Sequence, residues 1–182
     1  MAGGHVSLSY TLRRSTRARA LRLSVRPDGA VVVSAPHFLG LAAIERFLAK
    51  HAAWVRRKVE VMRGRSLIRI ARSDIRRLKE QARRFVHERC AYYANLYDVS
   101  FHKISIRAQK SRWGSCSKNG NLSFNYRLAA LPEHLREYII VHEVCHLVEL
   151  NHSKRFWALV EKSVPNHRAA RKELRAVNMV FY

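Results

Sequence analysis

Acidic residues, cysteines and long apolar runs are all scarce in this sequence, and each shortage excludes a class of protein. The 13 Asp and Glu residues stand against 35 Lys and Arg residues, so the formal net charge is +22. Cys90, Cys116 and Cys145 form no C-x-x-C pair, which argues against a disulfide framework and for a reducing compartment. No apolar run reaches the roughly 20 residues that span a bilayer. The first residues lack the apolar core of a signal peptide, so we expect a soluble, cytoplasmic protein without a membrane partner.

The surplus of basic residues predicts an affinity for polyanions. A strongly positive field attracts nucleic acid and other polyanions, although the same charge could serve only to solvate the surface. The basic residues are spread along the chain, and nothing marks a groove-entering helix, so sequence-specific reading of DNA is not expected. Nucleic acid or another polyanion is therefore a candidate partner.

Hydrophobic patterning in the first half predicts strands followed by helices. Residues 5–36 alternate around a turn at Pro27-Asp28-Gly29, which predicts an N-terminal β-hairpin. Apolar residues at helical spacing predict helices over 39–62 and 72–97, with Ser73 as the N-cap of the second.

The second half predicts a further hairpin and three helices. Asn119-Gly120 marks a turn, and residues 121–128 alternate as a strand. Pro132 opens a long apolar helix, a position that favours proline, and two shorter helices are predicted over 153–162 and 166–178. The chain is therefore expected to be α+β.

The long apolar helix carries ionisable groups in its middle. His142 and His146 are four residues apart, so they share one helical face and can hold one metal ion. Glu143 is turned partly off that line, where it can act as a general base toward a water at the metal. Ionisable groups in apolar surroundings are costly unless something pairs with them. This is the H-E-x-x-H pattern of zinc sites.

His152 is expected to supply a third ligand nitrogen. Asn151 tolerates left-handed backbone and could end the helix, so that the chain folds back at His152. Three protein ligands with one position left for water characterise catalytic zinc sites. We therefore predict one Zn2+ per chain, although nickel, cobalt, manganese or iron would also fit histidine ligands. The alternative is a core in which the histidines are hydrogen-bonded and Glu143 is neutral.

The segment QKSRWGSCSKNGNLSFNYRL, residues 109–128, is the second feature. Gly114 and Gly120 provide turns, and Trp113 provides a large flat surface. One interpretation places this hairpin beside the metal, with strand 121–128 as an exposed edge that pairs with an extended peptide. The alternative is a hairpin that packs in the core and buries Trp113.

Two motifs carry a resemblance to a known family. KSRWGSCSKNGNLSFNYRL followed by VHEVCHLVELNHSKRFW resembles the YgjP-like metallopeptidase domain, a relative of the SprT-like zincins. RLSVRPDGAVVVSAP resembles the start of that family, and the resemblance covers roughly residues 7–164. It implies a zincin-like fold, in which a small β-sheet packs on the H-E-x-x-H helix with supporting helices around it.

The resemblance also implies roles for individual residues. It gives the ligand role to His142, His146 and His152 and the base role to Glu143. It places four more residues near the cleft, as candidates for substrate binding: Trp113, Ser115, Asn125 and Arg127. We expect a single zincin-like domain over 1–182, with a β region at 5–36, a helical region at 39–97 and a metal-site core at 101–164.

The expected function is that of a zinc-dependent metallohydrolase, foremost a metallopeptidase, with a zinc-activated water and Glu143 as general base. Three alternatives stay open. The same metal site could serve a nucleotide (NTP) pyrophosphatase whose arginines hold the phosphates, although no Gly-rich phosphate loop is present. The chain could be a DNA-associated SprT-like protease, or a non-enzymatic polyanion-binding module with a structural metal. The substrate is therefore a peptide or a nucleotide.

Overall fold

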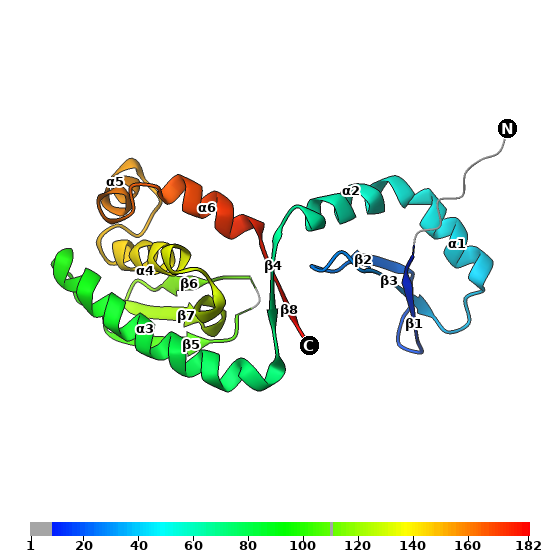
Figure 1. Cartoon of the computed structure of the whole chain (residues 1–182), viewed down its shortest axis with the longest axis horizontal. Coiled ribbons are helices and arrows are strands. Elements are labelled where there is room, and N and C mark those ends of the chain that lie inside the picture. The colour runs from blue at the N-terminus through cyan, green and yellow to red at the C-terminus, as the bar shows by residue number, and fades with distance from the viewer. Residues whose placement is uncertain (1–8, 110) are drawn as a thin grey trace. The chain divides into compact units, whose positions relative to one another are not determined.

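The computed structural model describes residues 9–109 and 111–182 (Figure 1). Residues 5–8 of the predicted N-terminal β region lie outside this part of the chain. The described residues fall into two compact units, unit 1 within Met1–Arg69 and Ala176–Val180, and unit 2 within Ile70–Arg175 and Phe181–Tyr182. The single domain expected over 1–182 stays a prediction.

Unit 1 is built on a three-stranded sheet of order β1-β3-β2. β1 (Thr11–Ser15) runs parallel to β3 (Val31–Pro36), and β2 (Arg22–Val25) runs antiparallel to it. Gly29 has a φ of +83° in the turn between β2 and β3, a conformation that favours glycine. Val33 and Ala35 of β3 pack with Ile44 and Leu48 of the following helix to form the core of this unit.

The helical part of unit 1 differs from the predicted single helix over 39–62. Two helices are present, α1 (Leu41–Lys50) and α2 (Ala52–Arg63), and the chain breaks between them at His51. The His51 Nδ1 lies 2.8 Å from the Phe47 carbonyl, a local bond that competes with continuation of the helix. β4 (Ser66–Ile70), which was not predicted, pairs with β8 (Val177–Phe181).

Unit 2 contains four α-helices, two short 3-10 segments and a second three-stranded sheet. Its helices are α3 (Ile75–Leu96), α4 (Glu133–Val148), α5 (Lys154–Ser163) and α6 (His167–Ala176), with short 3-10 turns η1 (Arg72–Asp74) and η2 (Tyr126–Ala130). Its strands are β5 (Lys103–Arg107), β6 (Gly114–Cys116) and β7 (Asn121–Asn125). α3 contacts β5 and α4 contacts β6, so the two long helices run alongside the sheet (Figure 1).

The prediction that strand 121–128 is an exposed edge was wrong. The sheet order is β5-β7-β6, so β7 is the central strand, parallel to β5 and antiparallel to β6. A third strand, β6, was not predicted; it precedes β7 in the sequence, and its Ser115 pairs with Ser123 of β7. The edge beside α4 is therefore β6.

Several predicted boundaries also moved. Asp74, rather than Ser73, occupies the N-cap position of α3. The last predicted helix ends at Ala176, because residues 177–181, with the sequence VNMVF, form β8. None of the helices within residues 9–109 and 111–182 combines the length and the apolar character that a membrane crossing requires.

Candidate metal centre and active site

α4 carries the H-E-x-x-H residues within a segment that is buried almost all round. Glu143 and His146 are 7% and 8% exposed, and the intervening Val144 and Cys145 are fully buried. Cys145 is a free thiol that packs in the core, as Cys90 does. The ionisable groups of α4 therefore sit in surroundings that offer little solvation.

Three histidines converge at one point. The candidate ligand nitrogens of His142, His146 and His152 all lie within 4.8 Å of one another. The Nε2 atoms of His142 and His152 are 3.1 Å apart. Zinc binds imidazole nitrogen at about 2.0–2.1 Å, and a tetrahedral arrangement then places ligand nitrogens roughly 3.3 Å from each other. The donor set therefore fits a tetrahedral divalent metal.

A backbone contact sets the tautomer of His146. Its Nδ1 lies 3.0 Å from the Glu149 carbonyl, which can only accept, so Nδ1 carries the proton. The lone pair is then on Nε2, the nitrogen that remains for a metal. In known metal sites, a hydrogen-bond acceptor on the other ring nitrogen orients the metal-binding histidine in the same way.

The turn after α4 places His152 next to His142 and His146, but its backbone differs from the prediction. α4 ends at Val148, and Glu149, at its C-cap, has extended backbone (φ −137°, ψ 106°). Among the described residues, the one non-glycine residue with a positive φ is Asp98. The prediction that Asn151 ends the helix in left-handed backbone was therefore wrong. Ser153 then caps α5 by accepting a hydrogen bond from the Phe156 N–H at 3.2 Å.

Phe156 forms a common wall for the three imidazoles. Its ring is fully buried and stacks on His146 with centroids 4.4 Å apart. The centroids of His142 and His152 lie 4.9 and 4.8 Å from it, both edge-on. The prediction of the site missed this residue, although it falls within the H-S-x-x-F-W part of the quoted motif.

The surroundings of His142 and His152 favour their neutral forms by lowering the pKa of each. Burial, the neighbouring imidazoles and Arg171 lower the pKa of His142 to about 3. Burial, His146 and Arg171 also lower the pKa of His152. Neutral imidazole is the form that binds metal, so these shifts favour the site at neutral pH.

Glu143 is held against the edge strand. Burial raises its pKa to about 8, against an opposing effect of Arg112. A Cβ at Gly114 would lie 2.6 Å from Glu143 Cγ and 2.6 Å from its Oε1, closer than atoms can approach. Gly114, expected to serve a turn, thus lets β6 pass directly beside the carboxyl group.

A cavity of about 220 Å³ opens onto this group. Trp113, Gly114 and Tyr138 line it together with His142 and Glu143. The structure therefore brings Trp113 to the H-E-x-x-H residues, whereas Ser115 lies one residue further along the β6 edge.

Asn125 and Arg127 make other contacts. Asn125 is 3% exposed, and its Nδ2 donates to the carbonyls of Gln109 at 2.7 Å and Arg112 at 3.0 Å. Its Oδ1 accepts from the Arg127 N–H at 3.2 Å. The Arg127 guanidinium lies 4.6 Å from the Phe181 ring centroid. The assignment of both residues to substrate binding stays a prediction. The hydrogen bonds of Asn125 hold the loop between β5 and β6.

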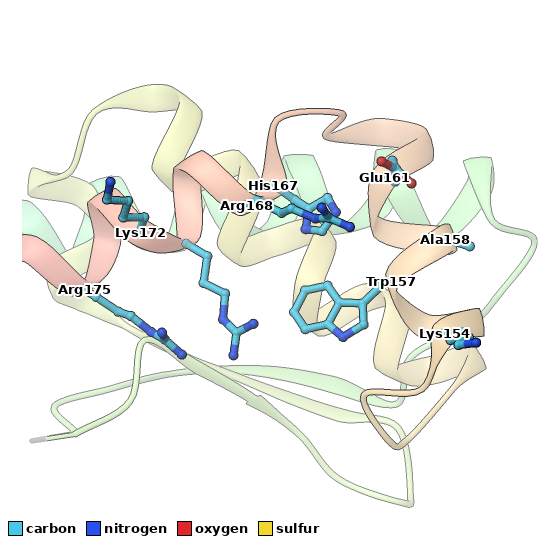
Figure 2. A pocket seen from close by; sticks show the side chains of 9 residues that line it. Lys154, Trp157, Ala158, Glu161, His167, Arg168, Lys172 and Arg175 are labelled. Carbon is cyan, nitrogen blue, oxygen red and sulfur yellow. The ribbon is translucent and has the colours of Figure 1, made fainter.

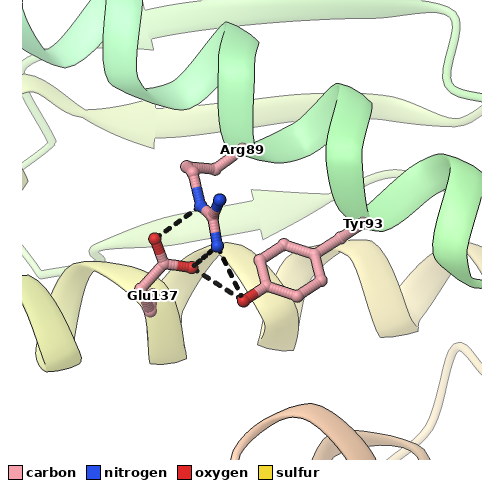
Figure 3. Close-up of polar contacts among 3 residues, drawn as sticks. All are labelled: Arg89, Tyr93 and Glu137. Atoms are coloured by element: carbon pink, nitrogen blue, oxygen red, sulfur yellow. Dashed lines mark hydrogen bonds and ion pairs between the residues drawn. The ribbon is translucent and has the colours of Figure 1, made fainter.

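Glu137 joins α4 to α3 (Figure 3). Its Oε1 lies 2.6 Å from Arg89 Nε, and its Oε2 accepts a hydrogen bond from the Tyr93 hydroxyl at 2.8 Å. The side chains of Arg89 and Glu137 are 27% and 17% exposed, so the ion pair is largely removed from water. Burial and the bond to Glu137 raise the pKa of Tyr93 to about 12. The cluster fixes α4 five residues before His142.

One family model matches most of the chain. The sequence matches the profile of the YgjP-like metallopeptidase domain over residues 19–75 and 69–177. A crystal structure of the metallopeptidase zymogen abylysin from Pyrococcus abyssi is 25% identical, with a TM-score of 0.47 over 52% of this chain and 99% of its own. The zymogen jannalysin from Methanocaldococcus jannaschii is 22% identical, with a TM-score of 0.43 over 50% of this chain and 91% of its own. No curated protein matches the sequence. The chain belongs to the YgjP-like metallopeptidase family and is a metal-dependent hydrolase.

Proposed function

We propose that the chain is a zinc metallopeptidase in which His142, His146 and His152 hold the ion and Glu143 is the general base. The convergence of three imidazoles within 4.8 Å beside a buried carboxyl group carries this proposal. Zinc is favoured over other divalent metals because three neutral nitrogen ligands with one open position suit its tetrahedral coordination. The finer description of the fold follows: unit 2 has a zincin-like arrangement, with a small sheet against the H-E-x-x-H helix.

Within this proposal, each residue has a separate task. When bound, the ion supplies Lewis acidity, which lowers the pKa of a water molecule and polarises the peptide carbonyl. Glu143 accepts a proton from the attacking water and delivers it to the departing amine nitrogen. A carboxyl group whose pKa has been raised by burial is suited to hold and release that proton near neutral pH. Phe156 and the Glu149 carbonyl keep the imidazoles in place.

The substrate lies along β6 in this account. β6 is an edge strand in the sheet of unit 2, and the backbone of Ser115 faces Ser123 of β7. An extended peptide can therefore add to the outward-facing backbone groups of Gly114 and Cys116. One substrate side chain would enter the 220 Å³ cavity beside Trp113. A second cavity of about 450 Å³ is lined partly by His146 and Leu150. Asn125 contributes by positioning the loop that leads into β6, rather than by touching the peptide.

Metal content and peptide hydrolysis test the proposal together. Elemental mass spectrometry is expected to find about one zinc per chain in the wild type and in Glu143→Gln, and none in His146→Ala. Glu143→Gln should lose about 10²–10⁴-fold in kcat on a peptide mixture, because general-base catalysis contributes that much. Full activity in Glu143→Gln, or equal zinc in His146→Ala, would contradict the assignment. Nucleoside triphosphates run in the same assay test the pyrophosphatase alternative.

A further inference from the structure

A basic pocket lies beside the metal cluster, between α5 and α6 (Figure 2). Its volume is about 670 Å³. Five cationic side chains from the two helices line it: Lys154, Arg168, Arg171, Lys172 and Arg175. Glu161 is the acidic residue in the lining. The volume falls within the range of ligand-binding pockets, which is roughly 300–1,000 Å³.

The cations of this basic pocket have no carboxylate partner among the described residues. Within residues 9–109 and 111–182, none of the five takes part in a salt bridge. Arginine elsewhere in the same unit does find a carboxylate, as Arg89 does in Glu137. Like charges gathered in a hollow repel one another, and an anion in the hollow relieves that repulsion.

Trp157 forms a wall shared by the basic pocket and the histidine cluster. Its ring centroid lies 5.6 Å from that of His152 and 5.9 Å from that of His142. The Arg171 guanidinium lies 5.1 Å from the Trp157 ring centroid. A substrate at the metal cluster is therefore one indole ring away from the basic pocket.

The surroundings of Trp157 distinguish between anion classes. His167 already stacks on the indole, with centroids 5.2 Å apart and planes 16° apart. Together with His152 and Arg171, it occupies the positions that a nucleobase would need for stacking. Carboxylates need no such surface, because guanidinium groups bind them edge-on through two hydrogen bonds.

We infer that the basic pocket binds carboxylate groups of an acidic segment of the polypeptide substrate, beside the bond that is cleaved. This inference rests on the proposed peptidase function and names its substrate class. It assigns specificity to Arg168 and Lys172, which are exposed and lie outside the metal cluster.

A binding experiment on the full-length, zinc-loaded Glu143→Gln protein tests this inference without turnover. Fluorescence anisotropy compares three labelled probes: a glutamate-rich decapeptide, the same peptide with every Glu changed to Gln, and a single-stranded oligonucleotide of ten residues. Arg168→Gln/Lys172→Gln is the pocket variant, and Arg155→Gln/Lys162→Gln is the control, since it removes the same charge from exposed positions outside the pocket. Circular dichroism checks that both variants fold.

The acidic peptide should bind about tenfold more tightly than its Gln counterpart, and the pocket variant should lose about tenfold while the control changes less than about twofold. Equal affinity for the two peptides, or equal losses in both variants, would overturn the inference. So would a loss in the pocket variant that affects only the oligonucleotide, which would make the pocket a nucleic-acid site. Wild-type protein is assayed on the same peptides: cleavage without acidic preference overturns the inference alone, whereas tight acidic binding without cleavage overturns the peptidase proposal and leaves the pocket assignment supported.

Discussion

Gly114 shows how one residue without a side chain shapes the candidate active site. Its Cα faces the Glu143 carboxyl group so closely that any Cβ would overlap it. The carboxyl group is thereby confined between β6 and the rest of α4. A base whose position is fixed in this way needs no reorganisation when a substrate arrives.

Gly114→Ala is therefore expected to impair catalysis more than metal binding. The new methyl group must displace Glu143 or shift β6, and a misplacement of about 1 Å can cost about 100-fold in rate. Steady-state kinetics should show this fall in kcat, while zinc content stays near one per chain. Gly40→Ala is a suitable control, because a Cβ there meets no atom within 4 Å. Wild-type kcat in Gly114→Ala would contradict the proposed position of the base.

The raised pKa of Glu143 predicts a pH dependence of stability in the metal-free protein. Its pKa is about 8 in the folded chain against an ordinary value of 4.5, so between these values the unfolded chain has lost a proton that the folded chain keeps. Raising the pH through this window therefore destabilises the folded state. Glu143→Gln removes the effect.

Thermal unfolding of chelator-treated protein measures this pH-dependent destabilisation by Glu143. The melting temperature of Glu143→Gln minus that of the wild type should be near zero at about pH 4.5 and should grow steadily toward pH 8. The comparison at each pH cancels the histidines, which both proteins share. A difference that stays constant with pH would show that Glu143 is not buried as described.

At the residue scale, spacing predicted that the three histidines come together beside Glu143, but not which residues support them. His142 and His146 follow from the helical period, and His152 from its place after the helix. Phe156 and Gly114 depend on how α5 and β6 approach α4, which no local pattern encodes. The three-way contact of Asn125 with main-chain groups is equally non-local, since it reaches 13 and 16 residues back to Arg112 and Gln109.

At the scale of elements, the Asn125 tether predicts a loss of activity without a loss of metal. Asn125→Asp keeps the acceptor for the Arg127 N–H and removes both donors to the loop. The loop into β6 should loosen, so kcat should fall about tenfold or more at unchanged zinc content. Asn121→Asp on the same strand, whose Nδ2 donates to the nearby Ser117 hydroxyl, serves as the control. Equal activity of both variants would contradict the proposed role of Asn125 in positioning the loop before β6.

The Arg89–Glu137 pair predicts a stability effect at the junction of α3 and α4. Glu137→Ala leaves a largely buried guanidinium and the Tyr93 hydroxyl without their acceptor. The free energy of unfolding should fall by about 2–3 kcal/mol, less than for a fully buried pair because water reaches part of both side chains. Urea denaturation measures this, and Glu80→Ala on the exposed face of α3 should cost less than about 1 kcal/mol. Similar losses in the two variants would mean that the pair adds nothing beyond a surface ion pair.

Elements were predicted best where a pattern was long. α3 and α4 follow from sustained helical spacing, whereas β6 has three residues, too few to show alternation. That omission led to the wrong edge strand, because a hairpin without β6 leaves β7 unpaired on one side. The break at His51 was missed because apolar spacing continues through it.

At the scale of the whole molecule, the net charge of +22 predicts an anionic partner but does not indicate where on the surface it would bind. The basic residues are spread along the sequence, and only the packing of α5 against α6 gathers five of them in one hollow. The charge also makes every polyanion a weak competitor in low salt, so specificity must be measured near physiological ionic strength.

The proposed mechanism depends most directly on where the metal binds, and anomalous X-ray scattering at the zinc edge would show that position. Crystals of the zinc-loaded protein should give one anomalous peak per chain, about 2.0–2.1 Å from a nitrogen of each of His142, His146 and His152. Glu143 should face the fourth position without ligating. A peak on Cys116 or on the basic pocket, or zinc ligated by Glu143 itself, would contradict the proposed mechanism.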